Sequence, residues 1–87
     1  MNHHHRKILH ALFAHPISAN ISLKDVESVL KELGAEIENR NGSRIAVTLN
    51  GKTHLFHHVA HDLPKDEVVQ FRKFLTESGI SPEQYPV

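Results

Sequence analysis

The sequence contains no cysteine. This absence excludes a disulfide scaffold and any metal site built on thiolates, and it is typical of proteins from a reducing compartment. No apolar run approaches the roughly 20 residues that a transmembrane helix needs, and the N-terminal residues show no secretory cleavage pattern. We therefore expect a cytoplasmic protein with no membrane partner.

The sequence also has no excess of charge of either sign, because ten basic residues balance ten acidic ones. A protein that holds a phosphate backbone by bulk charge is usually basic, so this balance counts against strong nonspecific nucleic-acid binding. The nine histidines weaken that objection, since imidazole gains a proton in mild acid or near a phosphate. Nucleic acid therefore stays a candidate ligand.

A chain of 87 residues has room for one domain with a modest core. We expect an N-terminal helix and connector over residues 1–20, a main domain over 21–81 and a tail over 82–87. The tail is expected to be extended.

Apolar residues recur at helical spacing in three segments, 6–15, 23–33 and 64–78. Ser22 is a good N-cap for the second helix, and Gly34 suits the left-handed position that ends it. Proline near the start of the third helix and glycine just after its end give that segment equally clear limits.

Three segments between these helices, 35–40, 44–49 and 52–59, read as short strands. The Asn-Gly pairs at 41–42 and 50–51 are typical of tight hairpins. The pattern predicts a three-stranded antiparallel meander, with two helices packed on one face, because neither layer can bury its apolar side alone. The fold class is therefore α+β.

The third strand can be placed in two ways, because Leu55 and Phe56 are adjacent and cannot both face the core. If Leu55 is buried, Phe56 and His58 face outward, and the aromatic ring is available to stack on a base. If Phe56 is buried, His57 faces outward instead. In either case, only one of these two histidines lies on the same face as Arg44.

Several local motifs occur in a distinctive order along residues 22–80. They are Leu33-Gly34 at the end of a helix, Gly42-Ser43 before the second strand, His57-His58 late in the third, Asp62-Leu63-Pro64-Lys65, and the final run 74–80. In this order they resemble the HicA family of type II toxin–antitoxin toxins. The resemblance implies an α-β-β-β-α domain like the double-stranded-RNA-binding domain, here with an extra N-terminal helix.

Members of that family are mRNA interferases, so the resemblance also implies an endoribonuclease that needs no metal or cofactor. Its expected partners are mRNA and a HicB-like antitoxin. The family's catalytic histidine follows the Gly-Ser pair, and here Arg44 occupies that position. Arginine can hold a phosphate through two hydrogen bonds but is a very poor general base.

Catalysis would then fall to another imidazole, and the candidate catalytic residues are His57 and His58. Histidine suits this task because it can take up or release a proton near neutral pH. The candidate RNA-binding residues are Ser43, Arg44, Lys52 and Lys65. The alternative is a non-catalytic module that binds RNA or a protein on the same fold.

A third hypothesis, a metal site, rests on four histidines: His54, His57, His58 and His61. Their spacing does not match a two-histidine helical site, and of the acidic residues only Asp62 is near. We therefore expect no bound metal. The histidine triplet at 3–5 is assigned no function.

Overall fold

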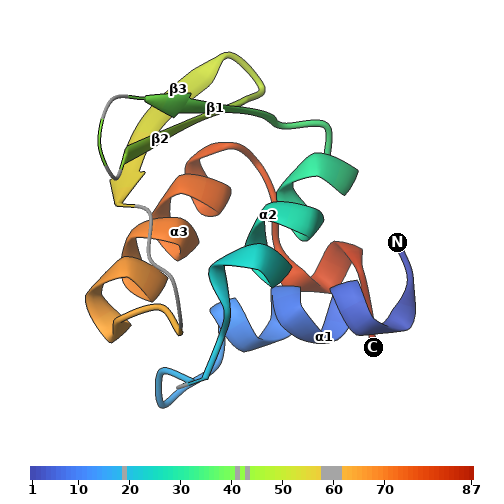
Figure 1. The fold of residues 1–87 in the computed structure, drawn as a ribbon. Helices are drawn as coiled ribbons and strands as arrows, with labels where there is room; N and C mark the ends of the chain where they lie inside the picture. Colours follow the sequence, from blue (N-terminus) through green and yellow to red (C-terminus); the bar gives the residue numbers. More distant parts are fainter. Residues whose placement is uncertain (19, 41, 43, 58–61) are drawn as a thin grey trace.

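The protein consists of three layers, in which helices α2 and α3 lie between a β-sheet and helix α1 (Figure 1). This computed structural model describes residues 1–18, 20–40, 42, 44–57 and 62–87. Its elements in chain order are α1 (His3–Leu12), α2 (Leu23–Glu32), β1 (Glu36–Arg40), β2 (Arg44–Leu49), β3 (Lys52–His57), α3 (Lys65–Glu77) and the short 3₁₀ helix η1 (Pro82–Gln84).

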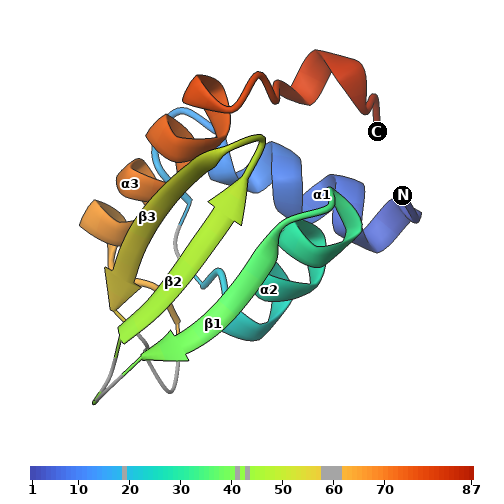
Figure 2. The same cartoon turned by 90° about the horizontal axis from the view of Figure 1, so that it is seen from above.

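The sheet has the strand order β1-β2-β3, with both pairs antiparallel. The predicted α+β class and the antiparallel meander are therefore confirmed. All helices lie on one side of the sheet, and its other face is open (Figures 1 and 2). Among the described residues, no helix is long and apolar enough to cross a membrane.

Helix α2 begins and ends where the sequence predicts. The Ser22 hydroxyl accepts a hydrogen bond from the Asp25 N–H at 3.2 Å, which satisfies one of the free donors at the helix start. At the other end, Gly34 has φ of +95°, and the Ala35 N–H donates to the Leu30 carbonyl at 2.9 Å. This is the Schellman arrangement, in which a left-handed residue lets the chain close back on the helix.

Helix α3 ends in the same way. Gly79 has φ of +83°, and the Ile80 N–H donates to the Leu75 carbonyl at 2.9 Å, as the spacing predicts. Its start differs by one residue from the expectation, because Pro64 is the N-cap and not the first helical residue.

The second hairpin is a tight two-residue turn. Asn50 and Gly51 have φ of +51° and +81°, the conformation that a type I′ turn requires at both positions. The Asn50 side chain also donates a hydrogen bond to the Ser78 carbonyl at 2.6 Å, so this turn is tied to the end of α3. In the first hairpin Arg40 pairs with Arg44, so three residues separate β1 from β2.

Helix α1 runs over His3–Leu12, three residues earlier at each end than the predicted segment 6–15. Asn2 sets its start by accepting a hydrogen bond from the His5 N–H at 2.8 Å. At its end, the Arg72 guanidinium of α3 donates to the carbonyls of Leu12 and Ala14, at 2.9 and 3.0 Å. Pro16 therefore limits how far the helix can extend but does not decide where it ends.

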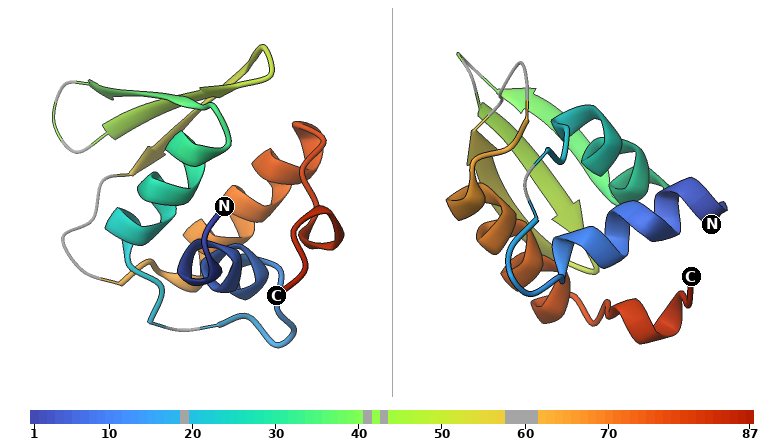
Figure 3. Two further views of the ribbon diagram at one scale, coloured as in Figure 1. Left: turned by 90° about the vertical axis from the view of Figure 1, so that its right-hand side faces the viewer. Right: turned by 90° about the horizontal axis from the view of Figure 1, so that it is seen from below.

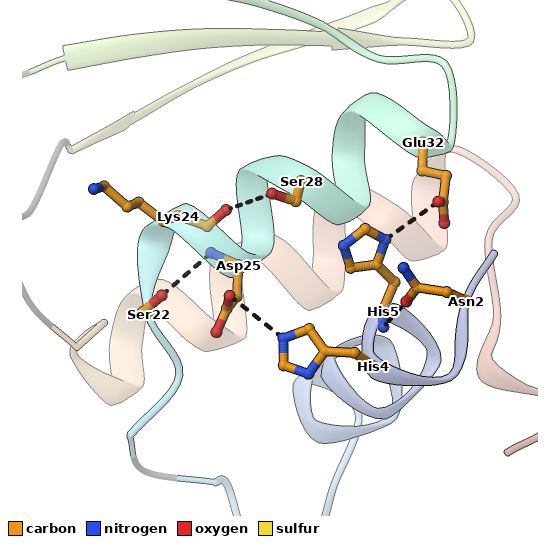
Figure 4. Close-up of polar contacts among 8 residues, drawn as sticks. All are labelled: Asn2, His4, His5, Ser22, Lys24, Asp25, Ser28 and Glu32. Carbon is orange, nitrogen blue, oxygen red and sulfur yellow. Dashed lines mark hydrogen bonds and ion pairs between the residues drawn. The ribbon is translucent and has the colours of Figure 1, made fainter.

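Two residues of the histidine triplet lie where α1 crosses α2 (Figure 4). His5 Nδ1 is 3.2 Å from a Glu32 carboxylate oxygen, and His4 Nε2 is 3.6 Å from a carboxylate oxygen of Asp25. Leu9, one turn after His5 on the same face of α1, is fully buried in the core. Helix α1 is therefore packed on the domain by polar and apolar contacts together.

Residues 82–87 do not form the extended tail that we expected. They contain η1, and the His10 Nε2–H of α1 donates to the Tyr85 carbonyl at 2.8 Å. The C-terminus thus lies beside α1 (Figure 3). No local pattern signals this contact, because its two partners are 75 positions apart.

Candidate nucleic-acid interface

The placement of β3 decides which histidine reaches the open face. Phe56 is only 1% exposed and stacks on Phe71 of α3, with ring centroids 3.9 Å apart. Leu55 is 50% exposed. Of the two placements left open by the sequence, the structure therefore has Phe56 buried and His57 facing outward. The ring of Phe56 is therefore not available to stack on a base.

Strand register brings three basic side chains into one row across the sheet. Arg40 of β1 is the cross-strand partner of Arg44 of β2, and Arg44 is the partner of His57 of β3. Neighbouring strands lie about 4.8 Å apart, so the three residues occupy adjacent positions on the same face. All three are exposed. We call this set the cationic row; it lies at the end of the sheet where β1 ends and β2 begins (Figure 2).

The rest of the open face is different in character. The next row consists of Glu38, Ala46 and Leu55, in register. Ala46 belongs to the open face by its register, yet it is only 3% exposed, because a short side chain on the central strand is covered by longer neighbours on both sides. The apolar and acidic middle of the face therefore confines the basic groups to one end.

Arg40 is engaged by a neighbour on its own strand. Its Nε lies 3.3 Å from a Glu38 carboxylate oxygen, and both side chains are more than half exposed. An ion pair of this kind contributes about 0–1 kcal/mol. A phosphate that approaches the row can therefore compete for the guanidinium at small cost.

His57 has an acidic neighbour on α3. Its Nδ1 lies 3.8 Å from a carboxylate oxygen of Glu67; the imidazole is 71% exposed and the Glu67 side chain 14%. The sequence identifies Glu67 only as one of the acidic residues that favour a helix N-terminus. Its contact with His57 depends on how α3 packs against the sheet, so no local pattern signals it.

Known proteins offer no identification. No family model matches the chain, and no curated protein or solved structure matches it either.

The remaining candidate residues are placed as follows. Lys52 begins β3, at the opposite end of the sheet from Arg44. It is five residues from His57 on the same strand, so the two residues belong to opposite faces of the sheet. Lys65 is exposed and begins α3, two residues before Glu67, so it lies at the same end as the cationic row. Ser43 and His58 lie outside the described residues. The structure therefore brings together Arg44, His57 and Arg40, the last of which the sequence did not single out.

The metal hypothesis gains nothing from the described part of the chain, where no three His, Asp or Glu side chains are placed to hold an ion. Of the four histidines on which it rests, His58 and His61 lie outside that part. His54 packs its ring 4.6 Å from that of Phe56, between centroids, on the helix side of the sheet. His54 and His57 thus belong to opposite faces.

Proposed function

We propose that this protein is a HicA-like toxin of a type II toxin–antitoxin system: an endoribonuclease that acts on mRNA and is inhibited by a HicB-like antitoxin. The element order from α2 to α3, α-β-β-β-α, is the order of the double-stranded-RNA-binding fold to which that family belongs. The observation that carries the proposal is the cationic row, in which Arg44 stands beside an exposed imidazole.

The row contains groups suited to cleavage of a phosphodiester. Arg44 would hold the phosphate and stabilise the negative charge that builds up on it. His57 would take the proton from the ribose 2′-hydroxyl, whose oxygen then attacks phosphorus while the bond to the 5′-oxygen breaks. The products are a 2′,3′-cyclic phosphate and a 5′-hydroxyl end. The leaving oxygen takes its proton from water or from a second imidazole, for which His58 is the candidate.

A non-catalytic RNA- or protein-binding module is the second candidate, and one observation favours it. The position of the family's catalytic histidine is held by Arg44, which does not release its proton under ordinary conditions. A row of two guanidinium groups and one imidazole can bind phosphates without cutting between them.

A cleavage assay separates the two candidates. Purified protein is incubated with single-stranded mRNA in EDTA, alongside the variants His57→Ala, His58→Ala and His15→Ala. His15 is an exposed residue of the connector after α1 and serves as the matched control. Discrete cleavage that survives His15→Ala but is lost in His57→Ala supports the ribonuclease. Binding without cleavage supports the module.

The variant Arg44→His gives a complementary result. It restores imidazole at the position where the family has its catalytic residue, directly across from His57. If the row faces the scissile phosphate, cleavage should rise or appear in this variant. A variant that binds RNA as the wild type does and still cuts nothing would contradict the catalytic assignment of the row.

The toxin assignment has its own test in cells. Expression of the protein in bacteria should arrest growth, and co-expression of the adjacent gene, as the antitoxin, should relieve the arrest. Normal growth at confirmed high expression would count against a toxin. Because mRNA is the expected target, the proposal places the protein in the cytoplasm.

A further inference from the structure

Glu67 occupies the position of α3 from which a glutamate usually completes a capping box. There the side chain reaches back to the backbone N–H of the N-cap residue. In α3 the N-cap is Pro64, which has no N–H, and the helix has no side-chain cap hydrogen bond. The Glu67 carboxylate is therefore not used in the cap of its own helix.

The Glu67 side chain is nevertheless well covered, with 14% of it exposed. A carboxylate that loses part of its hydration is stabilised by a polar or charged partner. Within the described residues, the basic group found within ion-pair distance of it is the His57 imidazole, with Nδ1 at 3.8 Å. The mostly buried side chain of Glu67 thus lies beside the largely exposed imidazole of His57.

This geometry distinguishes the two ring nitrogens of His57. A carboxylate beside Nδ1 favours the tautomer with the proton on that nitrogen, which leaves a free electron pair on Nε2. The two nitrogens point in diverging directions, so Nε2 is directed away from Glu67. At 3.8 Å the contact is longer than a direct hydrogen bond, so in the free protein the carboxylate acts on the Nδ1 proton through its negative charge.

We infer that Glu67 is a positioning residue, which holds the His57 imidazole with its proton on Nδ1 and keeps Nε2 free as the proton acceptor. The catalytic part of this inference rests on the proposed function, whereas the tautomer itself is a property of the free protein. Glu67 touches no reacting atom and acts only through His57.

The tautomer is measured by ¹⁵N NMR of the histidine rings in the free protein at about pH 8.5, where imidazoles are neutral. The signals of His57 are identified by their loss in His57→Gln. The test variant is Glu67→Met, because methionine fills a similar volume and is a good helix former. The matched control is Asp66→Met, which removes the neighbouring, exposed carboxylate of the same helical turn.

We expect His57 to be mainly Nδ1-protonated in the wild type and in Asp66→Met, and mainly Nε2-protonated in Glu67→Met. The backbone amide spectra of both variants report that the fold is retained. If the wild-type ring is mainly Nε2-protonated, or if the two variants give the same tautomer ratio, the inference is overturned, whatever the protein does to RNA.

RNA cleavage then provides an independent result. If the protein is a ribonuclease, Glu67→Met should lower kcat about 10–100-fold with little change in KM, a smaller loss than in His57→Ala. Asp66→Met should retain the wild-type rate. If Glu67→Met changes the tautomer of His57 but the wild-type protein cuts no RNA, the inference about Glu67 and His57 stands and the ribonuclease function is refuted.

Discussion

Phe56 of β3 stacks on Phe71 of α3 with 8° between the ring planes. This contact fixes the direction of every side chain in the strand, since successive residues point to opposite faces. With Phe56 facing the helices, the position of His57 lies on the open face beside Arg44, and its ring at the end of this edge strand also reaches Glu67 of α3. The aromatic pair in the core therefore determines the composition of the cationic row on the surface.

The first prediction tests this coupling through stability. Phe56→Ala should lower the free energy of unfolding by about 3–5 kcal/mol, because it leaves a cavity against Phe71. Leu55→Ala, at the adjacent position, should cost much less, since half of that side chain is already exposed to water. Urea unfolding of both variants measures the difference. Equal losses of unfolding free energy in the two variants would contradict the burial of Phe56 in place of Leu55.

The second prediction concerns the salt dependence of RNA binding. Arg44→Gln should weaken binding of single-stranded RNA and reduce the slope of log K against log salt by about 0.7, the value of one lost phosphate contact. Lys52→Gln provides the comparison: Lys52 is also a candidate RNA-binding residue, but it lies at the other end of β3 from the cationic row, so its loss should leave the slope unchanged. Filter binding or fluorescence titration at several salt concentrations supplies the slopes. The site is misplaced if Lys52→Gln lowers the slope and Arg44→Gln does not.

The third prediction concerns how α1 is held. Arg72 donates to two carbonyls at and just beyond the end of α1, where the helix has no partners of its own for these groups. Arg72→Met keeps the apolar stem but removes both donors, and should cost about 1.5–3 kcal/mol of stability. The exposed neighbour Lys73 provides the control Lys73→Met.

Chemical denaturation gives the size of the loss, and amide hydrogen exchange locates it. Faster exchange is expected in α1, beginning at its C-terminal turn. If Arg72→Met and Lys73→Met have the same small effect, the guanidinium does not stabilise the end of α1.

The fourth prediction separates two roles of Asn50. This residue adopts a positive φ, and its side chain donates to the Ser78 carbonyl. Asn50→Gly keeps the backbone conformation but loses the hydrogen bond, so it should cost about 1 kcal/mol. Asn50→Ala loses the hydrogen bond and adds backbone strain, so it should cost about 1–2 kcal/mol more. Thermal or urea unfolding ranks the two variants; an alanine variant as stable as the glycine variant would contradict the strained turn.

Much of the fold follows from local signals in the sequence. Helix α2 was predictable at both ends because its N-cap and its left-handed C-terminal residue act within a few positions of the helix. The Asn-Gly pair at 50–51 likewise specified a hairpin, since few other pairs accept positive φ at both turn positions. The position of Arg44 at the start of the second strand also followed from that strand's alternation, whereas its contact with phosphate stays a prediction.

Other features were beyond local patterns. The limits of α1 depend on Asn2 and on Arg72, which is 60 positions from Leu12. The inclusion of Arg40 in the cationic row depends on the register of the first hairpin. The contact between Glu67 and His57 depends on the docking of α3 against the edge of the sheet.

By itself, the sequence determined which segments form helices and strands and where its best-marked turns lie, because caps and turns are short-range interactions between neighbouring residues. Only the tertiary structure decided which of two adjacent apolar residues in β3 is buried, and with it which imidazole stands beside Arg44. The backbone hydrogen bonds of a strand can form equally well whether Leu55 or Phe56 faces the core. The choice is made by the aromatic surface that α3 presents, and that surface exists only after the helix has packed on the sheet.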